Sequence, residues 1–150
     1  MSDETIDWEA RLALAQEFTN RIPHSQHLGM RIDEIAPARA VVSLPYDESL
    51  VGDPETGVVH GGVITALLDT CSGAAVLCHP DTGFSTATID LRIDYMRPAT
   101  PEKRIIARAE CYRMTRYVAF VQARAFVEGE DEPVAAARGA FTVERKQETA

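Results

Sequence analysis

One apolar segment in the middle of the chain most strongly limits how the chain can fold. Residues 61–78 are apolar on almost every side of a helix, and Asp69 is the one charged residue among them. A helix that is apolar all round is a core helix, because a surface helix needs a polar face. The carboxylate in its middle argues against a membrane span, where a charge is costly. The rest of the chain must therefore surround this helix.

The flanking segments have the pattern of strands. In residues 88–95, for example, apolar residues at the odd positions alternate with Thr88, Asp90, Arg92 and Asp94, the period of a sheet with one buried face. The short links between the last four segments predict antiparallel neighbours. We therefore predict an α+β domain in which a curved antiparallel sheet wraps around the long helix, with open edges that favour oligomers. The predicted strands cover residues 29–35, 39–46, 85–96, 104–113, 117–127 and 134–143.

A shorter amphipathic helix is expected near the N terminus. Its spacing predicts a helix over residues 5–22 that Pro23 ends. Residues 47–57, which are rich in glycine, proline and aspartate, are expected to form a loop. Residues 1–24 are then a helical extension, and residues 25–150 form a single globular domain. The apolar stripe of this helix consists of Trp8, Leu12, Ala15, Phe18 and Ile22.

The composition excludes several classes of protein. The 150 residues include 15 Lys and Arg against 23 Asp and Glu, a formal charge of −8. A general nucleic-acid-binding protein would need a basic surface. The three cysteines form no C-x-x-C pair, so neither a disulfide framework nor a metal site is expected. The acidic N-terminal segment has no secretory signal, which predicts a cytoplasmic protein without a membrane segment.

The segment best suited to chemistry begins the central helix. It reads VVHGG at residues 58–62. Two glycines at a helix start let the backbone approach a ligand, and free N–H groups there suit an anion or a developing oxyanion. Burial would make the Asp69 carboxylate a better base or nucleophile. A structural reading is also open: the glycines allow tight packing, His60 is a cap, and Asp69 is a hydrogen-bonded core residue.

Helix geometry separates these groups within one chain. Asp69 follows His60 by nine residues, which is about 13–14 Å of helix rise and about half a turn in phase. The two groups therefore cannot easily share one substrate carbonyl. A two-fold dimer with antiparallel central helices would bring Asp69 of one chain to the helix start of the other. A site that uses both groups is expected at a subunit interface.

A second candidate region is basic. Residues 97–116 hold six Lys and Arg against two Glu, a local balance of +4 in a chain of −8. A ligand with several phosphates would find its counter-charges here. Solvated strand ends are the structural alternative.

Two segments resemble a known family. They are GVVHGGVITALLDT at residues 57–70 and TATIDLRIDYMRPA at residues 86–99. Both resemble the hotdog-fold thioesterases of the PaaI-like, phenylacetate-degradation group, and the order of elements agrees from Leu28 onward. The resemblance implies hydrolysis of acyl-coenzyme A thioesters by a homotetramer, a dimer of dimers. Coenzyme A is then part of the substrate, and no separate cofactor is expected.

The resemblance also implies roles for individual residues. Asp69 matches the catalytic carboxylate of the family, acting as nucleophile or as general base on water. Gly61 matches the residue whose backbone N–H polarises the thioester carbonyl, while His60 and Gly62 shape that turn. Thr88 stands where relatives often place a hydroxyl near the carboxylate. Charge and strand-end position give the candidates for the coenzyme A phosphates, namely Arg97, Arg113 and Arg116.

One residue departs from the family pattern, and two other functions stay open. Many relatives have an asparagine in the loop before the H-G-G motif, where the nearest analogue here is Asp53. A carboxylate cannot donate an amide N–H, so the orientation of the thioester or the water is in doubt. The alternatives are a non-catalytic acyl-CoA-binding oligomer and a hotdog-type enoyl-CoA hydratase. A binder would release no free thiol from an acyl-CoA ester.

Overall fold

The computed structural model describes residues 6–83 and 85–144. The helices are α1 (Trp8–Thr19), α2 (Pro23–Leu28) and α3 (Gly61–Leu77), with a 3₁₀ turn at Glu48–Leu50. The strands are β1 (Arg31–Ala36), β2 (Arg39–Leu44), β3 (Val51–Asp53), β4 (Val58–Val59), β5 (Thr88–Tyr95), β6 (Ile105–Met114), β7 (Val118–Val127) and β8 (Ala135–Thr142).

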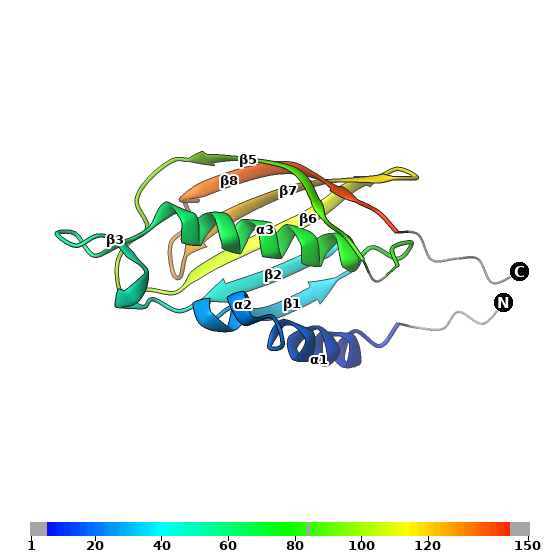
Figure 1. Ribbon diagram of the computed structural model, residues 1–150, viewed down its shortest axis with the longest axis horizontal. Coiled ribbons are helices and arrows are strands. Elements are labelled where there is room, and N and C mark those ends of the chain that lie inside the picture. Colours follow the sequence, from blue (N-terminus) through cyan, green and yellow to red (C-terminus); the bar gives the residue numbers. More distant parts are fainter. Residues whose placement is uncertain (1–5, 84, 145–150) are drawn as a thin grey trace, which may run out of the picture.

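The predicted α+β architecture is confirmed. Six antiparallel strands form one sheet in the order β1-β2-β6-β7-β8-β5, so β1 and β5 are its edges. Helix α3 runs along one face of this sheet (Figure 1). We call that face the inner face and the opposite one the outer face.

Helix α3 packs against a sheet whose inner face has alanines on its central strands. Ala107, Ala123 and Ala125 of the central strands are at most 4% exposed. Against them the helix buries Leu67 and Leu68 completely, and each such leucine contributes about 2 kcal/mol to folding.

Contrary to expectation, α3 is not buried on every side. Its opposite side, which carries Thr65, Asp69 and Gly73, is only half-buried. The prediction of a fully buried helix was wrong because alanine, glycine and threonine occur both in packed cores and on partly exposed surfaces. The buried residues form one stripe, made of Val63, Ile64, Leu67, Leu68, Cys71, Ser72, Ala75 and Val76.

The N-terminal helix differs from its prediction in two ways. It ends at Thr19, and Pro23 begins a second helix, α2, as the first-turn proline, where a missing N–H costs nothing. The residue that turns inward is Thr19, at 4% exposure, whereas Phe18 is 61% exposed. A helix that buries Leu12 and Ala15 places position 19, not 18, on the same face. The domain boundary placed after residue 24 falls within α2.

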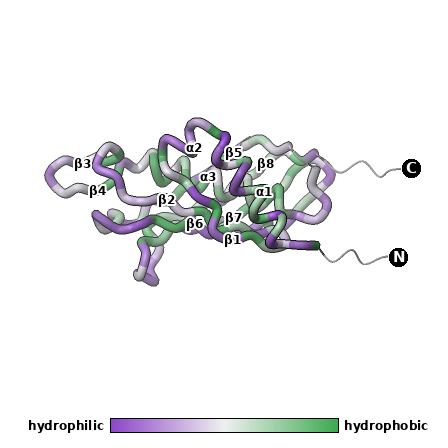
Figure 2. The backbone as a smooth tube through the Cα atoms, turned by 90° about the horizontal axis from the view of Figure 1, so that it is seen from below, coloured by the Kyte–Doolittle hydropathy of each residue, from purple (hydrophilic) through white to green (hydrophobic). Residues whose placement is uncertain are grey.

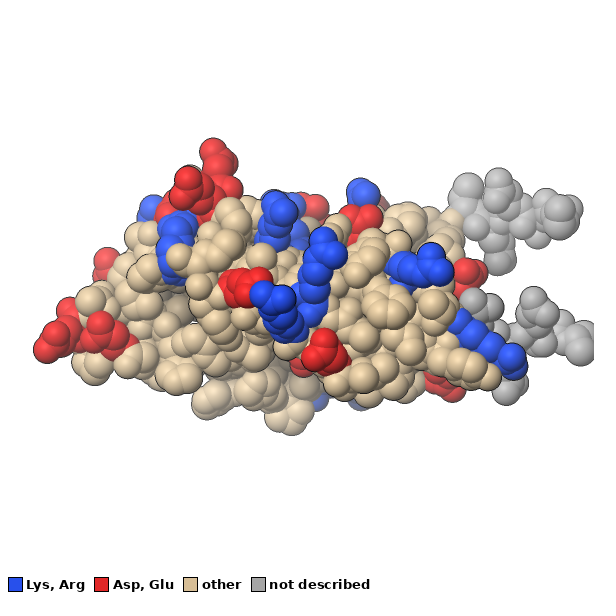
Figure 3. Space-filling model, turned by 90° about the horizontal axis from the view of Figure 1, so that it is seen from above, with Lys and Arg blue, Asp and Glu red and all other residues tan. Residues whose placement is uncertain are grey.

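The residues expected to be a loop, 47–57, include strand β3, which forms a hairpin with β4 just beyond them. The hydroxyl of Tyr46 donates to the Gly57 carbonyl at 2.7 Å, and Gly57 adopts φ 76°, a conformation that favours glycine. The turn between β3 and β4 is hydrophilic, and the hairpin projects from one end of the molecule (Figure 2). Acidic side chains gather at that end (Figure 3). The hairpin matters for the site because it lies next to the start of α3.

Candidate active site

The start of α3 is a capped helix terminus with one free donor. His60 is the N-cap residue, and its Nδ1 accepts a hydrogen bond from the Gly62 N–H at 2.9 Å. The His60 N–H donates to the Leu50 carbonyl at 2.8 Å. Among the described residues, the Gly61 N–H has no acceptor, as is usual for a first-turn amide. Lying at the positive end of the helix dipole, this amide is suited to bind an oxyanion.

The glycines of this turn serve different purposes. A Cβ at Gly62 would lie 2.9 Å from His60 Nδ1, and one at Gly52 would lie 2.8 Å from the His60 Cα. Both positions therefore need glycine for packing and capping. A Cβ at Gly61 would meet only the Tyr95 ring, at 3.5 Å, an ordinary contact. Packing thus does not require glycine at position 61, and the glycine leaves the backbone there open to close approach.

Asp69 lies two turns further along α3, on its half-buried side. One carboxylate oxygen, Oδ1, accepts a hydrogen bond from the Thr88 hydroxyl at 2.7 Å. Within the described part of the chain, no other group hydrogen-bonds this carboxylate. The arrangement orients Asp69 and leaves an oxygen able to accept a proton or to attack a carbonyl. The structure brings these two residues together, as the resemblance implied.

A third group lies beside Gly61, and sequence reasoning missed it. The Tyr95 hydroxyl hydrogen-bonds the Thr65 hydroxyl and lies 3.4 Å from the Gly61 carbonyl oxygen. Two signals could have identified Tyr95. It stands in the apolar register of its strand and inside the second segment that resembles the family.

Arg97 has a structural role in this chain. Its Nη1 donates to Glu130 Oε1 at 3.0 Å, and its Nη2 donates to the Glu132 carbonyl. The pKa of Glu130 is lowered by a hydrogen bond from Thr100 and by the nearby Arg97 and Lys103. Arg97 therefore ties the β5–β6 link to the β7–β8 turn through both of its Nη atoms.

The other two arginines lie elsewhere. Arg113 is near the far end of β6, and Arg116 is in the turn that follows. Because β6 has ten residues, they lie about 30 Å from its beginning, where Arg97 is. Both are exposed, and the Arg116 guanidinium stacks over Tyr117 at 5.2 Å. The three arginines therefore do not converge within one chain.

Asp53 is occupied by its own hairpin. Its Oδ2 accepts a hydrogen bond from the Thr56 hydroxyl at 2.8 Å, and its Oδ1 accepts one from the Glu55 N–H at 3.0 Å. These bonds lower the pKa of Asp53. The carboxylate thus shapes the turn that packs beside His60.

The cysteines are buried. Cys71, Cys78 and Cys111 are 0%, 9% and 4% exposed. Burial raises the pKa of the Cys71 thiol to about 12 and that of Cys78 to about 11, and it also raises the pKa of Cys111. A thiol of this kind is a poor nucleophile, because only the thiolate attacks. Cys71 and Cys78 are therefore small core residues of α3 and of its C-terminal cap.

A thiol titration checks this burial. We expect all three cysteines to resist an aromatic disulfide reagent in the native protein and to react fully once guanidinium unfolds it. The absorbance of the released thiolate measures both. Rapid reaction of any cysteine in the native state would contradict the burial described above.

Within residues 6–83 and 85–144, no helix is both long and apolar enough to cross a membrane. The same residues hold no group of three His, Cys, Asp or Glu side chains placed to bind a metal ion.

This fold and site define a hotdog-type protein, and comparisons with known proteins agree. A family model described as the thioesterase superfamily matches residues 56–134. The chain belongs to this superfamily.

Several individual proteins and solved structures are similar to this chain. A candidate esterase of Halobacterium salinarum is 31% identical over 93% of this chain and 97% of its own. The medium/long-chain acyl-CoA thioesterase YigI of Escherichia coli is 27% identical over 63% of this chain and 70% of its own. A Pseudomonas aeruginosa crystal structure is 41% identical, with a TM-score of 0.76 over 89% of this chain and 98% of that one. The Escherichia coli PaaI protein, 19% identical, shares the fold with a TM-score of 0.78 over 90% of this chain and 92% of that one.

Proposed function

We propose that this protein hydrolyses acyl-coenzyme A thioesters to a free acid and coenzyme A. One observation carries the proposal: α3 presents a free Gly61 N–H at its start and a carboxylate, Asp69, oriented by Thr88 on its open side. Acyl transfer needs an oxyanion donor and a base or nucleophile, which are these two groups. The acyl-CoA thioesterase named among the relatives supports this class of substrate.

A second copy of the chain brings the two groups together in this proposal. Within one chain, Gly61 and Asp69 are separated by eight residues, about 12 Å of helix rise. Edge strand β5 contacts α3 near both, with Thr88 at Asp69 and Tyr95 at Gly61. When two β5 strands pair antiparallel about their midpoints, Thr88 of one protomer lies opposite Tyr95 of the other. Asp69 of the protomer that supplies Thr88 then approaches Gly61 of the protomer that supplies Tyr95.

The surface around β5 supports such pairing. Ile89, Tyr95 and Met96 are 56%, 53% and 51% exposed, an apolar group on an edge strand of the kind that associates with another chain. The half-buried side of α3 lies next to it. A homotetramer made of two such dimers, in the cytoplasm, belongs to the same proposal.

The reaction follows from the two groups. Asp69 either takes a proton from water, whose oxygen attacks the thioester carbonyl carbon, or attacks that carbon itself. The carbonyl oxygen becomes an oxyanion, which the Gly61 N–H stabilises. The C–S bond then breaks, and coenzyme A leaves as a thiolate that takes up a proton. When Asp69 is the nucleophile, water afterwards hydrolyses the acyl-enzyme.

Coenzyme A recognition is assigned to the exposed arginines. Among the described residues, Arg113 and Arg116 have no carboxylate partner, so their guanidinium groups can bind phosphates, whereas Arg97 is held by Glu130. Asp53 supports the hairpin next to His60, where many relatives have an asparagine, and supplies no amide donor.

Thr88 gives a test of how Asp69 is oriented. We expect Thr88→Val to lower kcat/KM about tenfold, because it removes one hydrogen bond to a charged group. Thr88→Ser keeps the hydroxyl and should retain most of the activity. Steady-state kinetics and thermal melting of both variants measure the effect. Equal activity of the valine and serine variants would show that the hydroxyl has no catalytic role.

The proposed function is tested by free-thiol release from short-chain, medium-chain and arylacetyl coenzyme A esters. Steady turnover of at least one ester is the expected result, and the preferred ester identifies the acyl group. Tight binding of esters without thiol release would instead indicate a binding protein. Hydration of an enoyl-CoA without thiol release would indicate a hydratase.

A further inference from the structure

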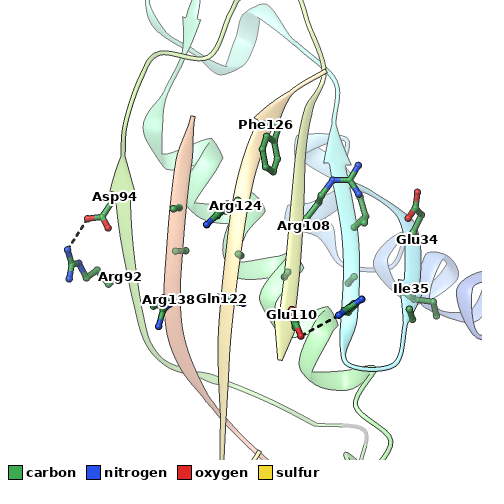
Figure 4. A pocket seen from close by; sticks show the side chains of 18 residues that line it. Glu34, Ile35, Arg92, Asp94, Arg108, Glu110, Gln122, Arg124, Phe126 and Arg138 are labelled. Atoms are coloured by element: carbon green, nitrogen blue, oxygen red, sulfur yellow. Dashed lines mark hydrogen bonds and ion pairs between the residues drawn. The ribbon is translucent and has the colours of Figure 1, made fainter. Parts of the chain in front are cut away.

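The outer face of the sheet carries a row of arginines that the catalytic proposal does not use. Arg108 of β6, Arg124 of β7 and Arg138 of β8 are all exposed. They line a shallow depression of about 640 Å³. Figure 4 shows this face with α3 behind the sheet. The depression is therefore separated from Asp69 by the thickness of the sheet.

The register of the strands places like charges opposite each other. Arg108 is the cross-strand partner of Arg124, and Arg92 is the partner of Arg138. Such pairs destabilise a sheet when nothing neutralises them. The side chains of Arg108 and Arg124 turn away from each other (Figure 4), which lowers the repulsion between them.

Other arginines on this face have carboxylate partners that neutralise their charge. Arg39 lies 3.6 Å from Glu110, and Arg92 lies 3.1 Å from Asp94. Among the residues that the structure describes, Arg108, Arg124 and Arg138 have no carboxylate within ion-pair distance. Arg138 is stacked over Tyr112, at 5.8 Å, while Arg108 and Arg124 have neither kind of partner within residues 6–83 and 85–144.

We propose that the outer face binds a small polyanion with neighbouring phosphate groups, held by Arg108, Arg124 and Arg138. The three side chains start from adjacent strands, and Arg138 lies two residues out of line with Arg124. Their Cα atoms therefore span about 12 Å, a distance that long arginine side chains can reach across to hold two or three linked phosphates. Guanidinium groups bind phosphate oxygens through paired hydrogen bonds.

The site is tested by calorimetric titration and thermal melting at low ionic strength, where exposed charges are least screened. The probes are tripolyphosphate, ADP and adenosine. We expect the first two to bind and to raise Tm, and adenosine to do neither. In Arg108→Gln/Arg124→Gln the affinity should fall at least about tenfold, since each lost charged hydrogen bond costs roughly that factor. The Tm of this variant without ligand should equal or exceed that of the wild type, because the like-charge pair is gone.

A matched control separates this site from general charge effects. Arg21→Gln/Arg31→Gln removes the same formal charge from exposed positions elsewhere and should bind tripolyphosphate like the wild type. The proposal is overturned when the wild type binds no tripolyphosphate, when Arg108→Gln/Arg124→Gln binds it equally well, or when adenosine binds as well as ADP. A further contrary result combines two observations. The wild type binds no anion, and sedimentation shows that Arg108→Gln/Arg124→Gln has lost a subunit contact. None of these readouts depends on thioester hydrolysis, so this site and the proposed activity can fail separately.

Discussion

Asp69→Asn is expected to remove nearly all thioester hydrolysis while leaving the protein folded. Asparagine has the same shape and can still accept the Thr88 hydrogen bond, but it can neither take a proton from water nor form an acyl intermediate. General-base catalysis alone contributes about 10²–10⁴-fold, so we expect kcat/KM to fall by about 10³-fold. Free-thiol release with the preferred ester measures the loss. Circular dichroism and sedimentation show whether fold and assembly are kept.

The control for this substitution is Asp81→Asn. Asp81 lies beyond the other end of α3 and its side chain is 71% exposed, so this variant loses the same charge without touching the site. Its activity should match the wild type. A fully active Asp69→Asn protein would remove Asp69 from the mechanism. Mass spectrometry of the rapidly quenched wild-type enzyme then separates the two routes, because only a nucleophilic Asp69 becomes acylated.

Gly61→Pro is expected to lower kcat by about 10²–10³-fold, the usual loss when one oxyanion donor is removed. Proline has no N–H but is well tolerated at the first position of a helix. The preceding residue, His60, already has φ −60° and ψ 137°, the extended conformation that a following proline requires. The substitution therefore deletes the proposed donor with little change to α3. Kinetics and thermal melting report the two effects separately.

Gly61→Ala is the matched control for the proline variant. It keeps the N–H and adds a methyl group in ordinary contact with Tyr95. It should lose much less activity than Gly61→Pro. Equal losses in the two variants would mean that crowding, not the missing donor, lowers the rate.

Mixing the two inactive variants tests whether the site is shared between subunits. A mixed dimer of Asp69→Asn and Gly61→Pro chains has one site with an intact Gly61 from one chain and an intact Asp69 from the other. Random assembly of equal amounts should restore about a quarter of the wild-type activity, because half the dimers are mixed and each has one complete site. Refolding the chains together and measuring thiol release gives the result. No recovery, with mixed dimers verified by native mass spectrometry, would place both groups in one chain.

Local patterns in the sequence determined the elements and the main catalytic candidates. Periodicity identified the long helix and six strands, because side-chain spacing reflects which residues share a face. The H-G-G motif and the single carboxylate in an apolar helix identified Gly61 and Asp69. The rise per residue of a helix was enough to predict that these two groups lie apart within one chain, without knowledge of the fold.

The tertiary structure decided which other residues reach the site. Alternation places Thr88 on the polar face of β5, but a bulge between Thr88 and Asp90 turns it inward, opposite Phe141 and within reach of Asp69. Arg97 is drawn into an ion pair with Glu130, 33 residues further along the chain. Bulges, register and long-range ion pairs depend on neighbours distant in sequence, so no local pattern encodes them. For the same reason the row of arginines on the outer face became visible only once β6, β7 and β8 were aligned.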